Sequence, residues 1–164
     1  VNPAFAKSSR PCPPFCIQPM QLRPGIETIG EQEIIHYAVM QSKGERMPDG
    51  SEVMLIDSRT PDWTAKGMIP GAVNLPWTLL SEAKGADPIS IAEIMTEQFG
   101  AKEQNGLFYF DDAKTLVMYC NGMWCGQSPN NIKSLLKYGY PADKIKWFRG
   151  GMQTWEILGF NTVK

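Results

Sequence analysis

The residues best suited to nucleophilic chemistry lie in one short segment, Cys120-Asn-Gly-Met-Trp-Cys-Gly-Gln-Ser128. The segment joins an apolar run typical of a buried strand to a pattern typical of a helix. Such a loop can curl around its first residue, so that backbone N–H groups of the loop and the helix point at the sulfur. Gly122 and Gly126 permit the dihedral angles this needs. These dipoles would lower the pKa of the Cys120 thiol and stabilise a thiolate or a persulfide anion.

The local pattern leaves alternatives for both cysteines of this loop. Cys120 can equally be a buried structural residue at a strand end, because free cysteine is among the most buried residue types. Cys125 is either a resolving thiol, which forms a disulfide with Cys120 or accepts its sulfur, or a small apolar loop residue. A separation of five residues does not guarantee a usable disulfide geometry.

The elements that must position this loop can be predicted from hydrophobic patterning. Continuous apolar runs predict strands buried on both faces, and cap residues with helical spacing predict the helices between them. Strands that alternate with helices predict an α/β domain, whose mostly parallel central sheet is flanked by helices on both faces. Ligands of such sheets bind beyond the carboxyl ends of the strands. The predicted strands are 53–56, 72–75, 115–119 and 145–148. The predicted helices follow Thr28-Ile-Gly-Glu31, which has the spacing of a capping box, cover 88–99, begin at an N-cap Ser128, and cover 152–158.

Length and charge exclude several classes of protein. The chain has 164 residues, which favours one domain with an additional arm. Sixteen basic and seventeen acidic residues leave no basic excess, so no nucleic acid partner is expected. The longest apolar run, from Leu116 to Cys120, is five residues, so no membrane span is expected. A single histidine excludes a His-rich centre within one chain, and no metal site is expected.

The N-terminal part differs in composition from the rest. Six of the thirteen prolines lie in the first 24 residues, and proline is incompatible with helix interiors. We therefore predict an extended proline-rich arm over 1–24 and one domain over 25–164. The even number of cysteines and the stretch Ala4-Phe5-Ala6, which resembles the end of a secretory signal peptide, favour a periplasmic or otherwise exported protein. A cytoplasmic protein is the alternative.

Cys12 and Cys16 flank Pro13-Pro14-Phe15 in this arm. The spacing allows a local disulfide, whereas the further ligands of a zinc ribbon are absent. The arm either docks a partner or takes part in redox chemistry, or it is a structural arm that wraps the domain. In the structural case the apolar residues Phe15, Ile17 and Met20 would be buried.

Four segments, in this order, resemble the rhodanese-like sulfurtransferase family. Asp57-Ser-Arg59 with Gly67-Met-Ile-Pro-Gly-Ala-Val-Asn-Leu-Pro76 is similar to the family's first signature. Leu116-Val-Met-Tyr-Cys120 is similar to the strand that delivers the catalytic cysteine. Leu135-Leu-Lys-Tyr-Gly-Tyr140 and Phe148-Arg-Gly-Gly-Met-Gln-Thr-Trp155 are similar to the closing segments. The resemblance covers residues 25–164.

The resemblance implies a role for each of these residues. Cys120 would be the nucleophile that accepts sulfane sulfur, and the backbone of residues 121–125 would surround it. Asp57 and Arg59 would position the loop through hydrogen bonds. Without the resemblance, the same two residues could also form an ordinary surface salt bridge at a strand end. No metal or organic cofactor is implied. The active-site loop would comprise Asn121, Gly122, Met123, Trp124, Cys125, Gly126, Gln127 and Ser128.

The implied function is transfer of sulfane sulfur from polysulfide, a persulfide or thiosulfate to a thiol or cyanide. The partners would be a small sulfur donor and a thiol acceptor, or a partner protein. Two alternatives remain: a thiol–disulfide redox protein that uses Cys120 and Cys125, and a non-catalytic sulfur-carrier or binding module.

This sequence departs from the family pattern in three ways that matter. The spacing from Cys120 to Gly139 is longer than in short single-domain members, which implies an enlarged loop with a wider mouth. Met68 replaces the histidine commonly found before Ile-Pro-Gly-Ala. The loop contains no Arg, Lys or His, so capture of small dianions such as thiosulfate should be poor and a less charged or more apolar donor preferred. The absent arginine also argues against a cysteine phosphatase, which uses one for bidentate phosphate contacts.

Overall fold

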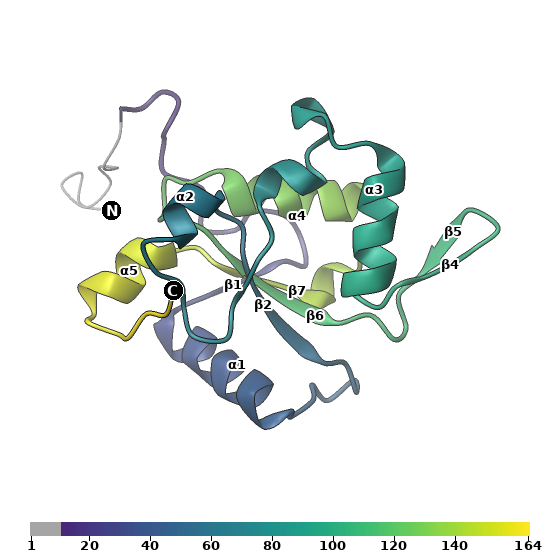
Figure 1. The fold of residues 1–164 in the computed structure, drawn as a ribbon, viewed down its shortest axis with the longest axis horizontal. Helices are drawn as coiled ribbons and strands as arrows, with labels where there is room; N and C mark the ends of the chain where they lie inside the picture. Colours follow the sequence, from purple (N-terminus) through teal and green to yellow (C-terminus); the bar gives the residue numbers. More distant parts are fainter. Residues whose placement is uncertain (1–10) are drawn as a thin grey trace.

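Five parallel strands form the central sheet of the computed structural model, which describes residues 11–164 (Figure 1). The strand order is β1-β7-β6-β2-β3, so β6, which leads to Cys120, lies in the middle. The predicted α/β architecture with a mostly parallel sheet is confirmed. Its strands are β1 (Glu27–Ile29), β2 (Val53–Asp57), β3 (Val73–Asn74), β6 (Thr115–Tyr119) and β7 (Ile145–Phe148).

Helices cover both faces of this sheet, which explains why its strands read as unbroken apolar runs. Leu116 and Met118 of β6 point into one core cluster, whereas Val117 and Tyr119 point into the other. Helices α3 (Pro88–Glu93) and α4 (Gln127–Lys137) cover the first face, and α1 (Glu31–Lys43) and α5 (Gly151–Ile157) cover the second (Figure 1).

The connections contain elements that the sequence patterns did not predict. The strands β4 (Lys102–Gln104) and β5 (Leu107–Tyr109) form an antiparallel hairpin that projects from the domain (Figure 1). In residues 11–164, no helix is long and apolar enough to cross a membrane. The remaining short elements are α2 (Pro61–Thr64), the 3₁₀ segments η2 (Trp77–Leu80), η3 (Glu82–Lys84) and η5 (Ala142–Lys144), and the π-helical turn η4 (Ile94–Gln98), which ends the predicted helix 88–99.

The predicted capping box at the start of α1 is wrong. Thr28 lies inside β1, where it pairs with β7, and its hydroxyl donates to the carbonyl of Met20. The helix begins after Gly30, whose N–H donates to the Glu33 carboxylate at 3.2 Å. Pairing with β7 therefore outweighs the local capping preference.

Residues 11–24 run as turns and extended chain, and Cys12 and Cys16 form a disulfide with a Cα–Cα distance of 4.6 Å. Leu22 already belongs to the core cluster that α3 and α4 cover. The division into an arm over 1–24 and a domain over 25–164 stays a prediction. The stretch Ala4-Phe5-Ala6, which supports the prediction of export together with the even number of cysteines, lies outside the described residues.

Candidate active site

The backbone at Cys120 is held in place by the start of α5. The N–H groups of Met152 and Gln153 donate to the carbonyls of Cys120 and Asn121, both at 2.9 Å. This contact requires a glycine at position 151, where φ is +58° and a Cβ atom would lie 2.4 Å from the Cys120 carbonyl oxygen. The close approach of α5 therefore fixes the first residues of the loop after β6.

The N-terminus of α4 points at the Cys120 sulfur. The helix begins at Gln127, so Ser128 belongs to its first turn and is not the predicted N-cap. The N–H of Ser128 donates to Cys120 Sγ at 3.5 Å, which brings the positive end of the helix dipole to the thiol. Within the loop itself, the N–H of Cys125 instead bonds the carbonyl of Gly122 at 2.9 Å.

Burial and hydrogen bonding shift the pKa values of the two loop cysteines in opposite directions. Complete burial raises the pKa of the Cys120 thiol well above its ordinary value, and the Ser128 N–H offsets this only in part. The prediction of a lowered Cys120 pKa is therefore wrong for this conformation. The hydrogen bond from the Cys120 thiol, aided by the backbone of Asn121 and Gln127, lowers the pKa of Cys125 to about 7. Cys125 is thus the thiol that ionises first.

Asp57 and Arg59 form a buried ion pair, which excludes the alternative of a surface salt bridge. Arg59 Nη2 lies 2.7 Å from Asp57 Oδ2, and the two side chains are 3% and 0% exposed. The guanidinium also donates to the carbonyl of Gly67 at 2.6 Å. The pair therefore joins the end of β2 to the Gly67 segment.

Ser58, between these two residues, makes the direct link to the cysteine loop. Its N–H donates to the carbonyl of Tyr119 at 3.0 Å, and its hydroxyl accepts from the Ser128 hydroxyl at 2.9 Å. Sequence reasoning missed this role, although the position of Ser58 at the end of a strand next to β6 was an available signal. The Asp57–Arg59 pair holds the turn that presents Ser58.

Part of the N-terminal segment covers the cysteines. Phe15 and Ile17 pack against the cluster of Cys120, Trp124 and Cys125, and the rings of Phe15 and Trp124 meet edge to face at 5.9 Å. In this arrangement Cys120 is 2% exposed and Cys125 is 3% exposed. Of the three apolar residues that the structural-arm alternative expects to be buried, Phe15 and Ile17 are partly buried, whereas Met20 is 67% exposed.

A cavity of about 240 Å³ opens beside the loop. The Lys66 ammonium in its wall lies 4.4 Å from the centre of the Trp63 ring. The cavity brings cationic, acidic, amide and aromatic groups next to the loop backbone, whereas the cysteine sulfurs are not part of its wall. Its lining consists of Arg59, Trp63, Lys66, Asn121, Trp124, Met152, Gln153 and Glu156.

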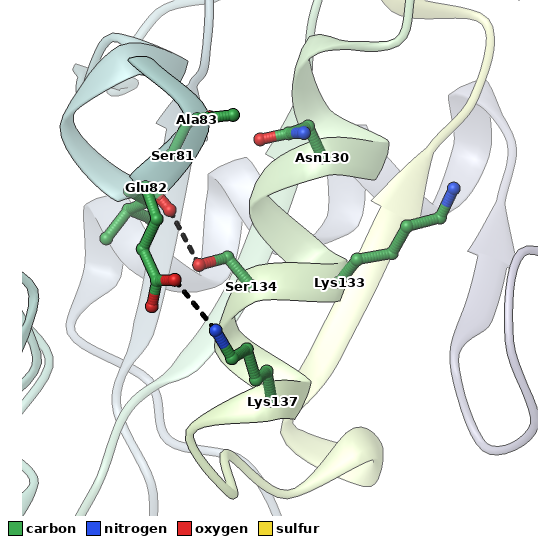
Figure 2. Close-up of a pocket in the computed structure, with 8 residues that line it drawn as sticks. Ser81, Glu82, Ala83, Asn130, Lys133, Ser134 and Lys137 are labelled. Atoms are coloured by element: carbon green, nitrogen blue, oxygen red, sulfur yellow. Dashed lines mark hydrogen bonds and ion pairs between the residues drawn. The ribbon is translucent and has the colours of Figure 1, made fainter. Parts of the chain in front are cut away.

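A second cavity, of about 230 Å³, lies between the η2–η3 segment and α4 (Figure 2). Ser134 Oγ donates to the carbonyl of Leu80 at 2.6 Å, and Lys137 pairs with Glu82 at 2.8 Å. Lys133 extends away from this pair in Figure 2. Since these polar groups serve each other, we place the candidate site at the cysteine loop. Across residues 11–164, no group of three or more His, Cys, Asp or Glu side chains is arranged to hold a metal ion.

A parallel sheet with a cysteine loop between its central strand and a helix N-terminus defines the class of protein. The family model of the rhodanese-like domain matches residues 41–158, and the chain belongs to this family. A sulfurtransferase from Allochromatium vinosum is 29% identical over 123 residues, which cover 75% of this chain and 90% of that protein.

Solved structures share the fold at low sequence identity. A rhodanese-related protein from Thermoplasma volcanium superimposes with a TM-score of 0.50 at 17% identity, covering 84% of this chain and 97% of its own. A protein of unknown function and possible tyrosine phosphatase from Rhodopseudomonas palustris gives a TM-score of 0.51 at 18% identity, covering 96% and 97%. These similarities support the fold alone.

Proposed function

We propose that this protein is a sulfurtransferase that carries sulfane sulfur on Cys120. The observation that carries the proposal is the position of Cys120 Sγ against the Ser128 N–H in the first turn of α4. A helix N-terminus stabilises a negative charge on a thiolate or on the terminal sulfur of a persulfide. The anchoring of the Cys120 and Asn121 carbonyls by α5 keeps the sulfur at this point.

The reaction we propose is a double displacement. The Cys120 thiolate attacks the sulfane sulfur of a donor, forms a new S–S bond and expels the rest of the donor as its anion. The thiolate of an acceptor then attacks the terminal sulfur of the Cys120 persulfide. This step breaks the S–S bond at Cys120, leaves a persulfide on the acceptor and regenerates the Cys120 thiolate. No net oxidation or reduction takes place.

Polysulfide or an organic persulfide fits this loop better than thiosulfate does. The loop itself supplies Met123, Trp124 and Cys125 where a cation would serve a dianion. Of the nearby cations, Arg59 is paired with Asp57, Arg149 donates to the carbonyl of Gln18, and Lys66 lies over the Trp63 ring. A donor with less charge than thiosulfate, such as an organic persulfide, needs none of them.

A thiol–disulfide reaction between Cys120 and Cys125 is the second candidate. It is favoured by the presence of both thiols in one buried cluster and by the thiol of Cys120, which lies 3.7 Å from the carbonyl oxygen of Cys125. In this reaction the two thiols would lose two electrons and two protons to an oxidising disulfide and form one bond with each other.

One experiment separates these candidates. The protein is reduced with a dithiol, desalted and incubated with polysulfide or thiosulfate, and added sulfur is located by peptide mass spectrometry. Wild type is compared with Cys120→Ser and Cys125→Ser. Sulfur on Cys120 that persists in Cys125→Ser supports the transferase. A reducible Cys120–Cys125 bond with no persulfide supports the redox protein, and neither modification supports a carrier or binding module that uses other residues.

A further inference from the structure

Residues 12–18, which we call the strap, lie across the nucleophile of the proposed reaction. Phe15 and Ile17 supply the apolar surface that packs on Cys120, Trp124 and Cys125. With the strap in this place the Cys120 thiol has almost no exposed surface. The strap therefore covers the cysteine cluster that a sulfur donor must reach.

Two sets of hydrogen bonds hold the C-terminal end of the strap. The N–H of Gln18 donates to the carbonyl of Met123, within the cysteine loop, at 2.8 Å. The Arg149 guanidinium donates to the carbonyl of Gln18 from Nε at 3.1 Å and from Nη2 at 2.7 Å. Arg149 follows β7 directly, so the strap is bound to the sheet and to the loop at the same residue.

A covalent bond closes the N-terminal part of the strap. The Cys12–Cys16 disulfide encloses Phe15, whose N–H also donates to the carbonyl of Pro11 at 3.0 Å. This small ring restricts the backbone that presents Phe15 to Trp124. Cys120 and Cys125, by contrast, are free thiols. The chain thus holds an oxidised pair in the cover and a reduced pair beneath it.

We propose that the strap is a redox-controlled cover of Cys120, closed while Cys12 and Cys16 are joined and released when a dithiol reduces them. A thiolate of the dithiol attacks one sulfur of the disulfide and breaks the S–S bond, and its second thiol resolves the mixed disulfide. The dithiol is oxidised to a disulfide. Its two electrons and two protons pass to Cys12 and Cys16, which become thiols. Phe15 then loses the ring that orients it, and the cover opens.

The role of the cover in sulfur transfer rests on the proposed function. The cover itself does not, because access to Cys120 can be measured without any sulfur transfer. The full chain is treated with iodoacetamide, and the rate of alkylation at Cys120 is followed by peptide mass spectrometry. Four proteins are compared: the oxidised wild type, the wild type after reduction by a dithiol and its removal, Cys12→Ser/Cys16→Ser, and Arg149→Met. Met20→Ala, which alters an exposed side chain two residues beyond the strap, is the control.

We expect reduction, removal of the disulfide and Arg149→Met each to accelerate alkylation of Cys120 about tenfold, since each removes a strong constraint on the strap. Met20→Ala should keep the wild-type rate. Equal rates in all these proteins would overturn the cover. Faster alkylation in Arg149→Met with no effect of reduction would overturn its redox control.

Hydrogen exchange separates an open strap from an unfolded protein. The amides of β6 should stay protected in the reduced wild type, because the core beneath the loop is unchanged when only the strap moves. Loss of protection in β6 together with the gain in alkylation of Cys120 would contradict the proposal.

Discussion

Cys120 and Cys125 differ in ionisation although one buried cluster holds both. The difference follows from burial and hydrogen bonding: complete burial raises the pKa of the Cys120 thiol, which also donates a hydrogen bond, whereas Cys125 receives hydrogen bonds that favour its thiolate. The nucleophile of the proposed reaction is therefore protonated in the closed conformation, and its neighbour is the thiol ready to lose a proton near neutral pH.

A pH titration of the thiolate absorbance checks this order. Because the pKa of Cys125 is lowered to about 7, one thiolate should form near neutral pH in the wild type and be absent in Cys125→Ser. The folded state then binds fewer protons than the unfolded state between pH 7 and the ordinary thiol pKa of 9.0, so wild type should gain stability over Cys125→Ser as the pH rises through this window. An unchanged neutral step in Cys125→Ser would contradict the assignment.

The buried Asp57–Arg59 pair predicts a large effect of one substitution. Asp57→Asn leaves the Arg59 guanidinium buried without its counter-charge, and we expect the free energy of unfolding to fall by about 3–5 kcal/mol. Glu52→Gln is the matched control, because the Arg46–Glu52 pair is exposed and should change it by less than about 0.5 kcal/mol. Urea denaturation measures both. A similar, small effect of the two substitutions would show that burial does not strengthen the dependence of Arg59 on Asp57.

At the scale of elements, the site is the meeting of β6, α4 and α5. The buried strands and the position of Cys120 at the end of β6 follow from apolar runs and could be predicted. The start of α4 could not be predicted. Ser128 and Pro129 have strong local preferences for a helix start, but Ser128 lies in the first turn, where its hydroxyl bonds the Ser58 hydroxyl instead of capping the helix. The contact of α5 with the loop joins residues 32 positions apart and leaves no local pattern.

The contact at Gly151 predicts that a methyl group at this position slows the loading of Cys120 with sulfur, whereas a methyl group at a glycine without such a contact lowers only the stability. In Gly151→Ala the new methyl group would collide with the Cys120 carbonyl, so the loop must shift, and we expect sulfur loading to slow about a hundredfold. Gly159→Ala shares the positive φ, at +78°, but has no atom within 4 Å of its new methyl group. It should cost about 1 kcal/mol of stability and leave loading unchanged. Equal loading rates in the two variants would contradict the positioning role of α5.

Across the whole molecule, the N-terminal segment and the cysteine loop contribute side chains to one apolar cluster. The predicted α/β fold is confirmed, and the prolines correctly excluded a helix over residues 11–24. Composition could not show that Phe15 and Ile17 would meet the cysteine loop, because that contact joins segments about a hundred residues apart and rests on tertiary packing. The same packing explains why the thiol pKa expected from the loop alone was wrong.

The absence of a cation in the loop predicts the choice of donor. Catalytic efficiency with thiosulfate should be about tenfold or more below that with an organic persulfide, whose sulfane sulfur carries at most one negative charge, because no charged hydrogen bond compensates the dianion's loss of water. Met123→Arg should raise the efficiency with thiosulfate, whereas Met123→Gln, of similar length and without charge, should not. A low Michaelis constant for thiosulfate in the wild type would count against this preference.

Transfer of sulfur through Cys120 is tested by the intact mass of the protein, measured after loading with sulfur and again after addition of a thiol acceptor. Reduced wild type is treated with polysulfide, desalted and weighed intact by mass spectrometry, and a small thiol is then added. We expect one added sulfur per chain, located on Cys120. The added thiol should take up this sulfur and become a persulfide. Cys120→Ser should carry no added sulfur at that position. Undiminished loading and transfer in Cys120→Ser, or a wild type that gains sulfur and never passes it to the thiol, would contradict this expectation.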